Sequence, residues 1–155
     1  MSYDLMVFRK ESAPKKRAGF MNWYKKQIKW TEEHTYDDPS ITSTELRNWF
    51  MEMIQTFPAM NGPFASDDTE SSNVSDYSIG KDVIYVAFSW TLAEQAYARM
   101  LELAEKHEVG FFDVSSDNGD ILFPENGKLK AIDNPKINST SSTSEQRSKP
   151  WWKFW

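Results

Sequence analysis

The sequence predicts an α+β sandwich in which three helices cover a mixed, mainly antiparallel sheet. Two segments, Tyr3–Phe8 (YDLMVF) and Val83–Phe88 (VIYVAF), are apolar at nearly every position, which indicates strands buried on both faces. Elsewhere apolar residues recur every three or four positions, as they do on amphipathic helices. The resulting element order predicts a ferredoxin-like β-α-(α)-β-β-α-β-β fold.

Two helices are expected between the first strand and the second. Ser12 can cap the first of them, which should run to about Trp30. Its apolar stripe consists of Phe20, Trp23, Tyr24 and Ile28. The second helix should start at a capping box formed by Thr42 and Glu45 and stop at Pro58.

The second half of the chain predicts a hairpin, a third helix and two further strands. Residues 77–79 should pair with the VIYVAF strand. Thr91 and Glu94 have the spacing of a capping box, and GFFDV follows the helix as a strand. Asn118-Gly119 then predicts a tight turn into a return strand at residues 120–123.

In the predicted topology the first and third strands lie side by side and parallel at the centre of the sheet. Leu5 with Val7, and Met6 with Phe8, make both faces of the first strand apolar. Because an apolar sheet face does not stay open to water, something must cover the second face. The candidates are one of the two early helices, the Trp-rich tail or another subunit.

Residues 1–130 are expected to form the single domain, and residues 131–155 a polar, flexible tail. The tail is rich in Ser and Thr and ends in KPWWKFW. Trp151, Trp152 and Trp155 are candidate partner-binding residues, because clustered large apolar side chains mark interaction sites.

Composition excludes several kinds of chemistry. The chain has no cysteine, so disulfides, thiolate metal sites and cysteine nucleophiles are excluded. It has no apolar leader and no stretch near the roughly 18 apolar residues of a membrane span. We therefore expect a cytoplasmic protein without a membrane partner. We find no P-loop, dinucleotide fingerprint, HExxH or GxSxG motif, so no catalytic residue, cofactor or metal ligand is assigned.

Charge is distributed unevenly along the chain. Residues 1–30 carry eight Lys or Arg and two acidic residues, whereas the remaining 125 carry ten basic and 21 acidic residues. An acidic body disfavours nucleic acid and suits a basic protein partner. The candidate partner-binding carboxylates are Glu32, Glu33, Asp37, Asp38, Asp67, Asp68, Glu70 and Asp76.

Three stretches, MSYDLMVF, YVAFSWTLAEQAY and VGFFDVSSDNGDILFP, resemble a widespread, uncharacterised group of small bacterial proteins that begin MSYDL. The resemblance covers roughly residues 1–125 and leaves out the tail. It implies no catalytic residue, because the shared motifs are a strand, a helix start and a helix. In size and acidic charge the chain also resembles immunity proteins encoded beside bacterial toxins.

These observations favour a non-catalytic protein-binding protein, in its most concrete form an immunity protein that neutralises a basic bacterial toxin. One alternative is a hydrolase that uses carboxylates with His34 and a divalent ion. Another is a sheet that stacks RNA bases on Phe8, Tyr85 and Phe88. A housekeeping domain that forms a homodimer is the last alternative.

Overall fold

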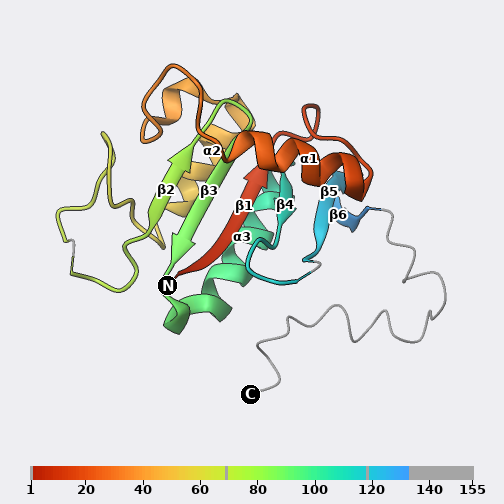
Figure 1. The fold of residues 1–155 in the computed structure, drawn as a ribbon. Coiled ribbons are helices and arrows are strands. Elements are labelled where there is room, and N and C mark those ends of the chain that lie inside the picture. The colour runs from red at the N-terminus through yellow and green to blue at the C-terminus, as the bar shows by residue number, and fades with distance from the viewer. Residues whose placement is uncertain (1, 69, 118, 133–155) are drawn as a thin grey trace.

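The structure is a computed structural model that describes residues 2–68, 70–117 and 119–132. It is an α+β fold with three α-helices and a six-stranded sheet (Figure 1). The strands are β1 (Tyr3–Phe8), β2 (Asp76–Ile79), β3 (Val83–Phe88), β4 (Gly110–Phe112), β5 (Ile121–Glu125) and β6 (Lys128–Ala131). The helices are α1 (Arg17–Gln27), α2 (Thr44–Met53) and α3 (Ala93–His107), with short 3-10 turns at Pro39–Ile41 and Trp90–Leu92.

The strand order is β2-β3-β1-β4-β5-β6, and every neighbouring pair is antiparallel. The predicted adjacency of β1 and β3 is confirmed, with Leu5 opposite Val86. The expected parallel direction of this pair, and with it the mixed sheet, is wrong. The reason is the β2–β3 hairpin: β2 runs in the same direction as β1, so the chain reversal makes β3 antiparallel to both.

The sheet has a helical layer on each face (Figure 1). Helices α2 and α3 cover one face, where Leu5 and Val7 of β1 join a core cluster that includes Trp49. Helix α1 covers the other face and packs on Met6 and Phe8. An early helix therefore covers the second apolar face, which was one of the three possibilities that the sequence left open.

The contacts of α1 follow from its sequence spacing. Phe20 and Tyr24 lie one turn apart and are buried. The ring of Phe20 meets those of Phe8 and Phe112 at centroid distances of 5.0 and 5.2 Å. Trp23, also in the predicted stripe, packs beside them. Burying each such side chain stabilises the fold by roughly 1.5–3 kcal/mol.

The helix starts differ from those expected. Helix α1 begins at Arg17, because the Ser12 hydroxyl donates to Asp82 at 2.8 Å instead of capping. Helix α2 is capped by Ser43, which accepts from the Leu46 amide, and Thr42 donates to the Lys81 carbonyl.

At the third helix the expected capping box is also wrong. Ser89 caps the preceding 3-10 turn by accepting from the amide of Thr91. Helix α3 then begins at Ala93 without a side-chain cap. Short hydroxyl residues are frequent before each helix, and only the path of the chain selects among them.

The last hairpin departs most from expectation. Strand β5 continues through Pro124, and Asn126-Gly127, with φ of 54° and 78°, turns the chain into β6. Positive φ at both central residues is typical of a two-residue hairpin turn. In the connection from β4 to β5, the Gly119 amide donates to the Ser116 carbonyl at 3.1 Å, which is the hydrogen bond of a four-residue turn at the predicted place, although Asn118 itself lies outside the described residues.

Gly119 is needed in that connection for its lack of a side chain. A Cβ at this position would lie 1.9 Å from the carbonyl oxygen of Asp113.

The tail residues 133–155, including Trp151, Trp152 and Trp155, lie outside the described residues. Within the described chain, no helix is long and apolar enough to cross a membrane.

Candidate protein-binding surface

The two acidic loops singled out in the sequence lie along the same edge of the sheet, one at each end of edge strand β2. The amide of Ile79, the last residue of β2, donates to the Tyr36 carbonyl at 2.7 Å and holds the first loop there. Gly62 packs against the first loop so closely that a Cβ would lie 2.2 Å from the carbonyl oxygen of Asp37. The chain between α2 and β2 therefore contacts the first acidic loop directly.

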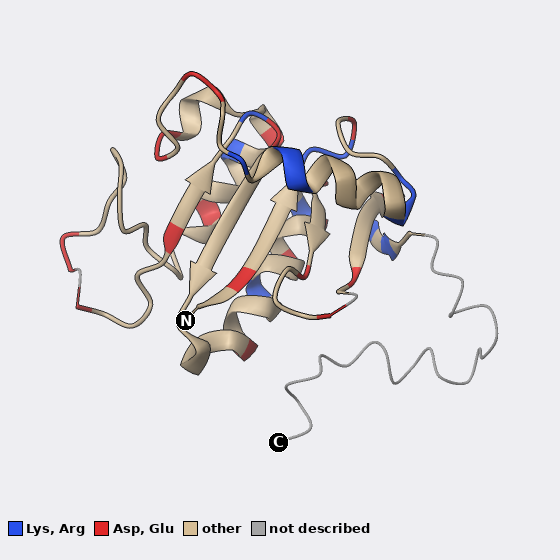
Figure 2. Ribbon diagram, in the orientation of Figure 1, with Lys and Arg blue, Asp and Glu red and all other residues tan. Residues whose placement is uncertain are grey.

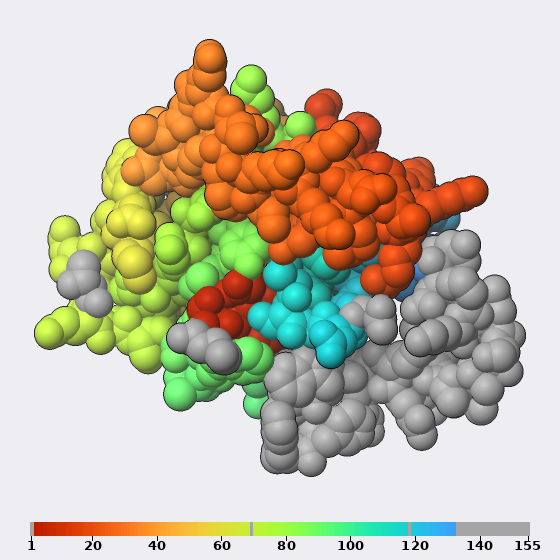
Figure 3. Space-filling view, in the orientation of Figure 1, coloured from red at the N-terminus to blue at the C-terminus, as the bar shows by residue number. Residues whose placement is uncertain are grey.

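The second acidic loop is anchored at its base by the same segment. The Ser75 amide donates to the Pro58 carbonyl and the Ser66 amide to the Ala59 carbonyl, each at 2.8 Å. In the space-filling view the orange loop before α2 and the yellow segment after it form one continuous side of the molecule (Figure 3). Figure 2 shows acidic residues along this side and basic residues along α1 and the chain before it.

We call this side the acidic edge and define it by the eight predicted carboxylates, Glu32, Glu33, Asp37, Asp38, Asp67, Asp68, Glu70 and Asp76. Five of them are exposed: Glu33, Asp67, Asp68, Glu70 and Asp76. Within the described residues, no carboxylate of the edge pairs with a Lys or Arg. The structure thus places both predicted loops along one edge of the sheet, where the five exposed carboxylates make no ion pair with the described residues.

Two members of the edge also hold the first loop in shape. The backbone amide of Ser40 donates to the Asp38 carboxylate and holds the pKa of Asp38 below its usual value. Glu32 accepts from the Lys81 amide at 3.1 Å and bonds to the His34 ring. The Thr35 carbonyl, and after it Glu32, raise the pKa of His34. Glu32 and His34 therefore tie the loop to the β2–β3 turn.

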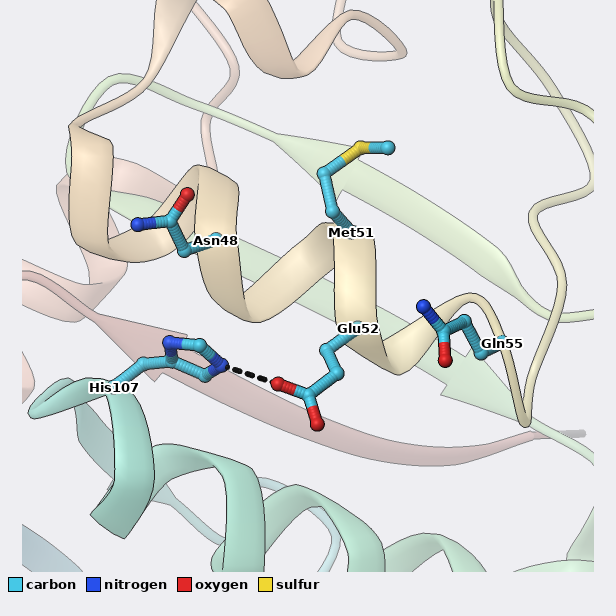
Figure 4. A pocket seen from close by; sticks show the side chains of 5 residues that line it. All are labelled: Asn48, Met51, Glu52, Gln55 and His107. Carbon is cyan, nitrogen blue, oxygen red and sulfur yellow. Dashed lines mark hydrogen bonds and ion pairs between the residues drawn. The ribbon is translucent and has the colours of Figure 1, made fainter.

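His34 does not sit in a cluster of metal ligands. Among the described residues, no group of three or more His, Asp or Glu side chains could hold an ion. The other histidine, His107, lines an open pocket of about 430 Å³ with Asn48, Met51, Glu52 and Gln55 (Figure 4). Its Nε2 lies 2.9 Å from Glu52 Oε1.

Glu52 bridges the two helices that cover the first face of the sheet. Lys106 of α3 donates to both Glu52 oxygens, at 2.8 and 2.9 Å. Lys106, and after it His107, hold the pKa of Glu52 below its usual value. A carboxylate kept charged by two neighbours stabilises the α2–α3 contact, but it is a poor base for abstracting a proton.

Two other carboxylates have special surroundings that no pattern in the sequence indicates. Asp4 on β1 accepts a hydrogen bond from Tyr85, and burial, followed by Asp4, raises the pKa of Tyr85. Asp113, directly after β4, is only 5% exposed. Burial, followed by the charge of Asp120, raises the pKa of Asp113 to about 7.

The base-stacking face of the RNA-binding alternative does not form. Phe8 and Phe88 are both buried, and they belong to the core clusters on opposite faces of the sheet. Tyr85 alone of the three is partly exposed. Side chains that point to opposite faces cannot form one stacking platform.

No protein-family model, no curated protein and no solved structure matches the chain.

Proposed function

We propose that the protein is a non-catalytic binding protein whose acidic edge docks onto a basic protein. Its concrete form is an immunity protein that neutralises a basic bacterial toxin. The observation that supports the proposal is the set of exposed carboxylates, gathered from two loops and left without Lys or Arg partners. Such a surface attracts a positively charged protein and orients it during association.

Fold topology is compatible with this role and adds a finer assignment. We propose that β1 to β4 with α2 and α3, which cover the same face of the sheet, correspond to a ferredoxin-like core, supported by the strand order β2-β3-β1-β4. In this assignment α1, on the other face, and the β5–β6 hairpin are additions.

A hydrolase is the second candidate, and the Glu52–His107 pair in an open pocket is the observation that favours it. The lining side chains of that pocket are two amides, one thioether, the carboxylate and the imidazole. A serine, threonine or cysteine nucleophile is not among them, so the reaction would have to use water. Loss of a measured hydrolytic activity in a His107→Ala variant would favour this candidate over the binding role.

The binding proposal predicts a charge effect on association. We expect the triple variant Asp67→Lys, Asp68→Lys, Glu70→Lys to slow association with the basic partner by about 10-fold or more at low salt. The wild-type association rate should decrease as salt rises, because it depends on electrostatic attraction. This decrease should be smaller for the triple variant. The measurement is surface plasmon resonance against the partner isolated from the native host with the full-length chain.

A matched control reverses charge on the opposite side. Lys25→Glu and Lys26→Glu change exposed residues of α1. At a salt concentration of about 0.15 M they should leave the association rate within about twofold, because charges separated by more than the Debye length, about 8 Å at that ionic strength, are screened. Equal rates for the wild type and the acidic-edge variant would contradict the proposed surface.

The immunity role is tested separately. Co-expression of this protein should restore growth of cells that produce the toxic partner, and continued growth arrest would contradict the immunity role.

A further inference from the structure

An apolar groove lies between α3 and the β5–β6 hairpin, on the face of the sheet that α2 and α3 cover. Its walls are Leu101, Leu122 and Leu129, and its volume is about 350 Å³. Each of the three leucines is partly exposed at the margin of the core. Glu102 and Glu105 complete the lining from α3.

The groove follows from the strand order. Along β5 and β6, Leu122, Pro124 and Leu129 point toward the α3 side, because Leu129 pairs with Pro124 and Leu122 lies two residues before it. Helices α2 and α3 pack against each other, and α3 contacts β1, β4 and β6. Within the described chain no helix follows beyond α3, so the leucines at this margin keep part of their surface open.

The rim of the groove is acidic. Glu102 pairs with Arg99 at 2.8 Å. Glu105 is exposed and makes no hydrogen bond or ion pair with the described residues. An apolar floor beside a free carboxylate suits a segment that carries large apolar side chains together with a positive charge.

We propose that the last seven residues of this same chain, KPWWKFW, occupy the groove. The three tryptophans and Phe154 match its leucine walls, and Lys149 and Lys153 match the charge of Glu105. Aromatic side chains combine large buried area with few rotatable bonds, which makes them effective anchors. This inference does not depend on the acidic edge or on any partner of it.

Chain connectivity allows the contact. The Ile132 amide donates to the Ile121 carbonyl at 3.0 Å, so the described chain ends beside the strand that carries Leu122. Sixteen residues separate Ile132 from Lys149, enough for an extended reach on the order of 50 Å. A tether of this length keeps the segment at an effective concentration on the order of millimolar, so even weak binding is populated.

Other exposed apolar residues fit the segment less well. Met51 lines a pocket with two amides and with Glu52, whose negative charge is already paired with Lys106. Met60 and Phe64 lie beside β2, the strand at the opposite edge of the sheet from β6. Compared with these sites, the leucine groove combines an apolar floor, a free carboxylate and proximity to Ile132, where the described chain ends.

The test uses the absence of cysteine in the chain. A nitroxide attached to Ser148→Cys in the full-length, 15N-labelled protein should selectively broaden the amide signals of the groove, including those of Leu101, Leu122 and Leu129. Two variants should abolish this broadening. One replaces Trp151, Trp152 and Trp155 by Ser, and the other combines Leu129→Glu with Glu105→Lys.

Controls separate docking from unfolding and from dimers. The tail variant leaves residues 1–132 unchanged, so its spectrum should keep the dispersion of the wild type. A nitroxide at exposed Ser40 should broaden neither groove nor tail. Broadening that is absent, spread evenly, or retained in the Trp-to-Ser variant would overturn the proposal. A further control mixes 15N-labelled protein that carries no nitroxide with 14N protein that carries one. Broadening of the groove signals in this mixture would show that the tail docks onto a second copy instead of its own chain.

Discussion

Replacing Asp113 by Asn should stabilise the protein at pH 8 by up to roughly 4 kcal/mol and change its stability little at pH 4. Asp113 is 5% exposed, and its Oδ1 has no hydrogen-bond partner. A charged carboxylate in such a position lacks the hydration it has in the unfolded chain. The neutral amide of Asn resembles the protonated acid and removes this cost.

The direction of the pH dependence follows from the raised pKa. In the folded protein the pKa of Asp113 is raised to about 7, compared with an ordinary value of 3.8. Below the ordinary value both states hold the proton, and the group does not oppose folding. As pH rises toward 7 the unfolded chain loses its proton first, so wild-type stability decreases, and it levels off above the folded pKa.

Urea denaturation at several pH values between 4 and 8 measures this effect. The difference in unfolding free energy between Asp113→Asn and the wild type should grow with pH. Asp117→Asn, an exposed change in the same connection, serves as the control, and its difference should stay near zero. A stability difference for Asp113→Asn that is the same at both ends of the range would show that its charge is not the cause.

Gly110→Ala should destabilise the protein by about 3 kcal/mol, at the upper end of the usual cost of overpacking. A Cβ on Gly110 would lie 2.1 Å from a ring carbon of Phe8. The ring has little freedom to move, because Phe8 is fully buried and meets the rings of Phe20 and Phe123 at 5.0 and 5.1 Å. The added methyl group therefore displaces β4 or the aromatic cluster under α1.

A double-mutant cycle identifies the clash as the cause. Phe8→Leu alone creates a cavity and lowers stability, but Gly110→Ala should cost less in that background, with a coupling of about 1 kcal/mol or more. Gly80→Ala is the matched control, since its Cβ would meet neighbours at an ordinary 3.5 Å. Additive effects of the two substitutions in thermal or urea unfolding would contradict the steric explanation.

Elements were predictable wherever one stretch of chain carries its own pattern. The unbroken apolar runs of β1 and β3 and the helical spacing of Phe20 and Tyr24 on α1 needed no knowledge of their neighbours. Strand β6 (KLKA) has a weak pattern and was missed, although Asn126-Gly127 is a typical hairpin turn. A strand at the edge of a sheet buries little, so its sequence is weakly constrained.

The carboxylates of the acidic edge were also recognisable, because charge density is a property of local composition. That the two loops lie along one edge of the sheet was not recognisable from the sequence. It depends on the contact of Gly62 with Asp37 and on the hydrogen bond between Ile79 and Tyr36. Asp113 shows the same limit. In the sequence it resembles Asp117 and Asp120 of the same loop, and only its neighbours in space make it buried.

The sequence by itself determined the α+β class, the strands and helices with strong periodicity, and the need to cover both faces of β1. Only the tertiary structure decided that α1 supplies the second cover, that β1 and β3 are antiparallel, and that two acidic loops share one edge. The physical reason is range. Periodicity, capping and charge act between residues a few positions apart, whereas strand direction, burial and surface assembly depend on contacts between residues far apart in the chain.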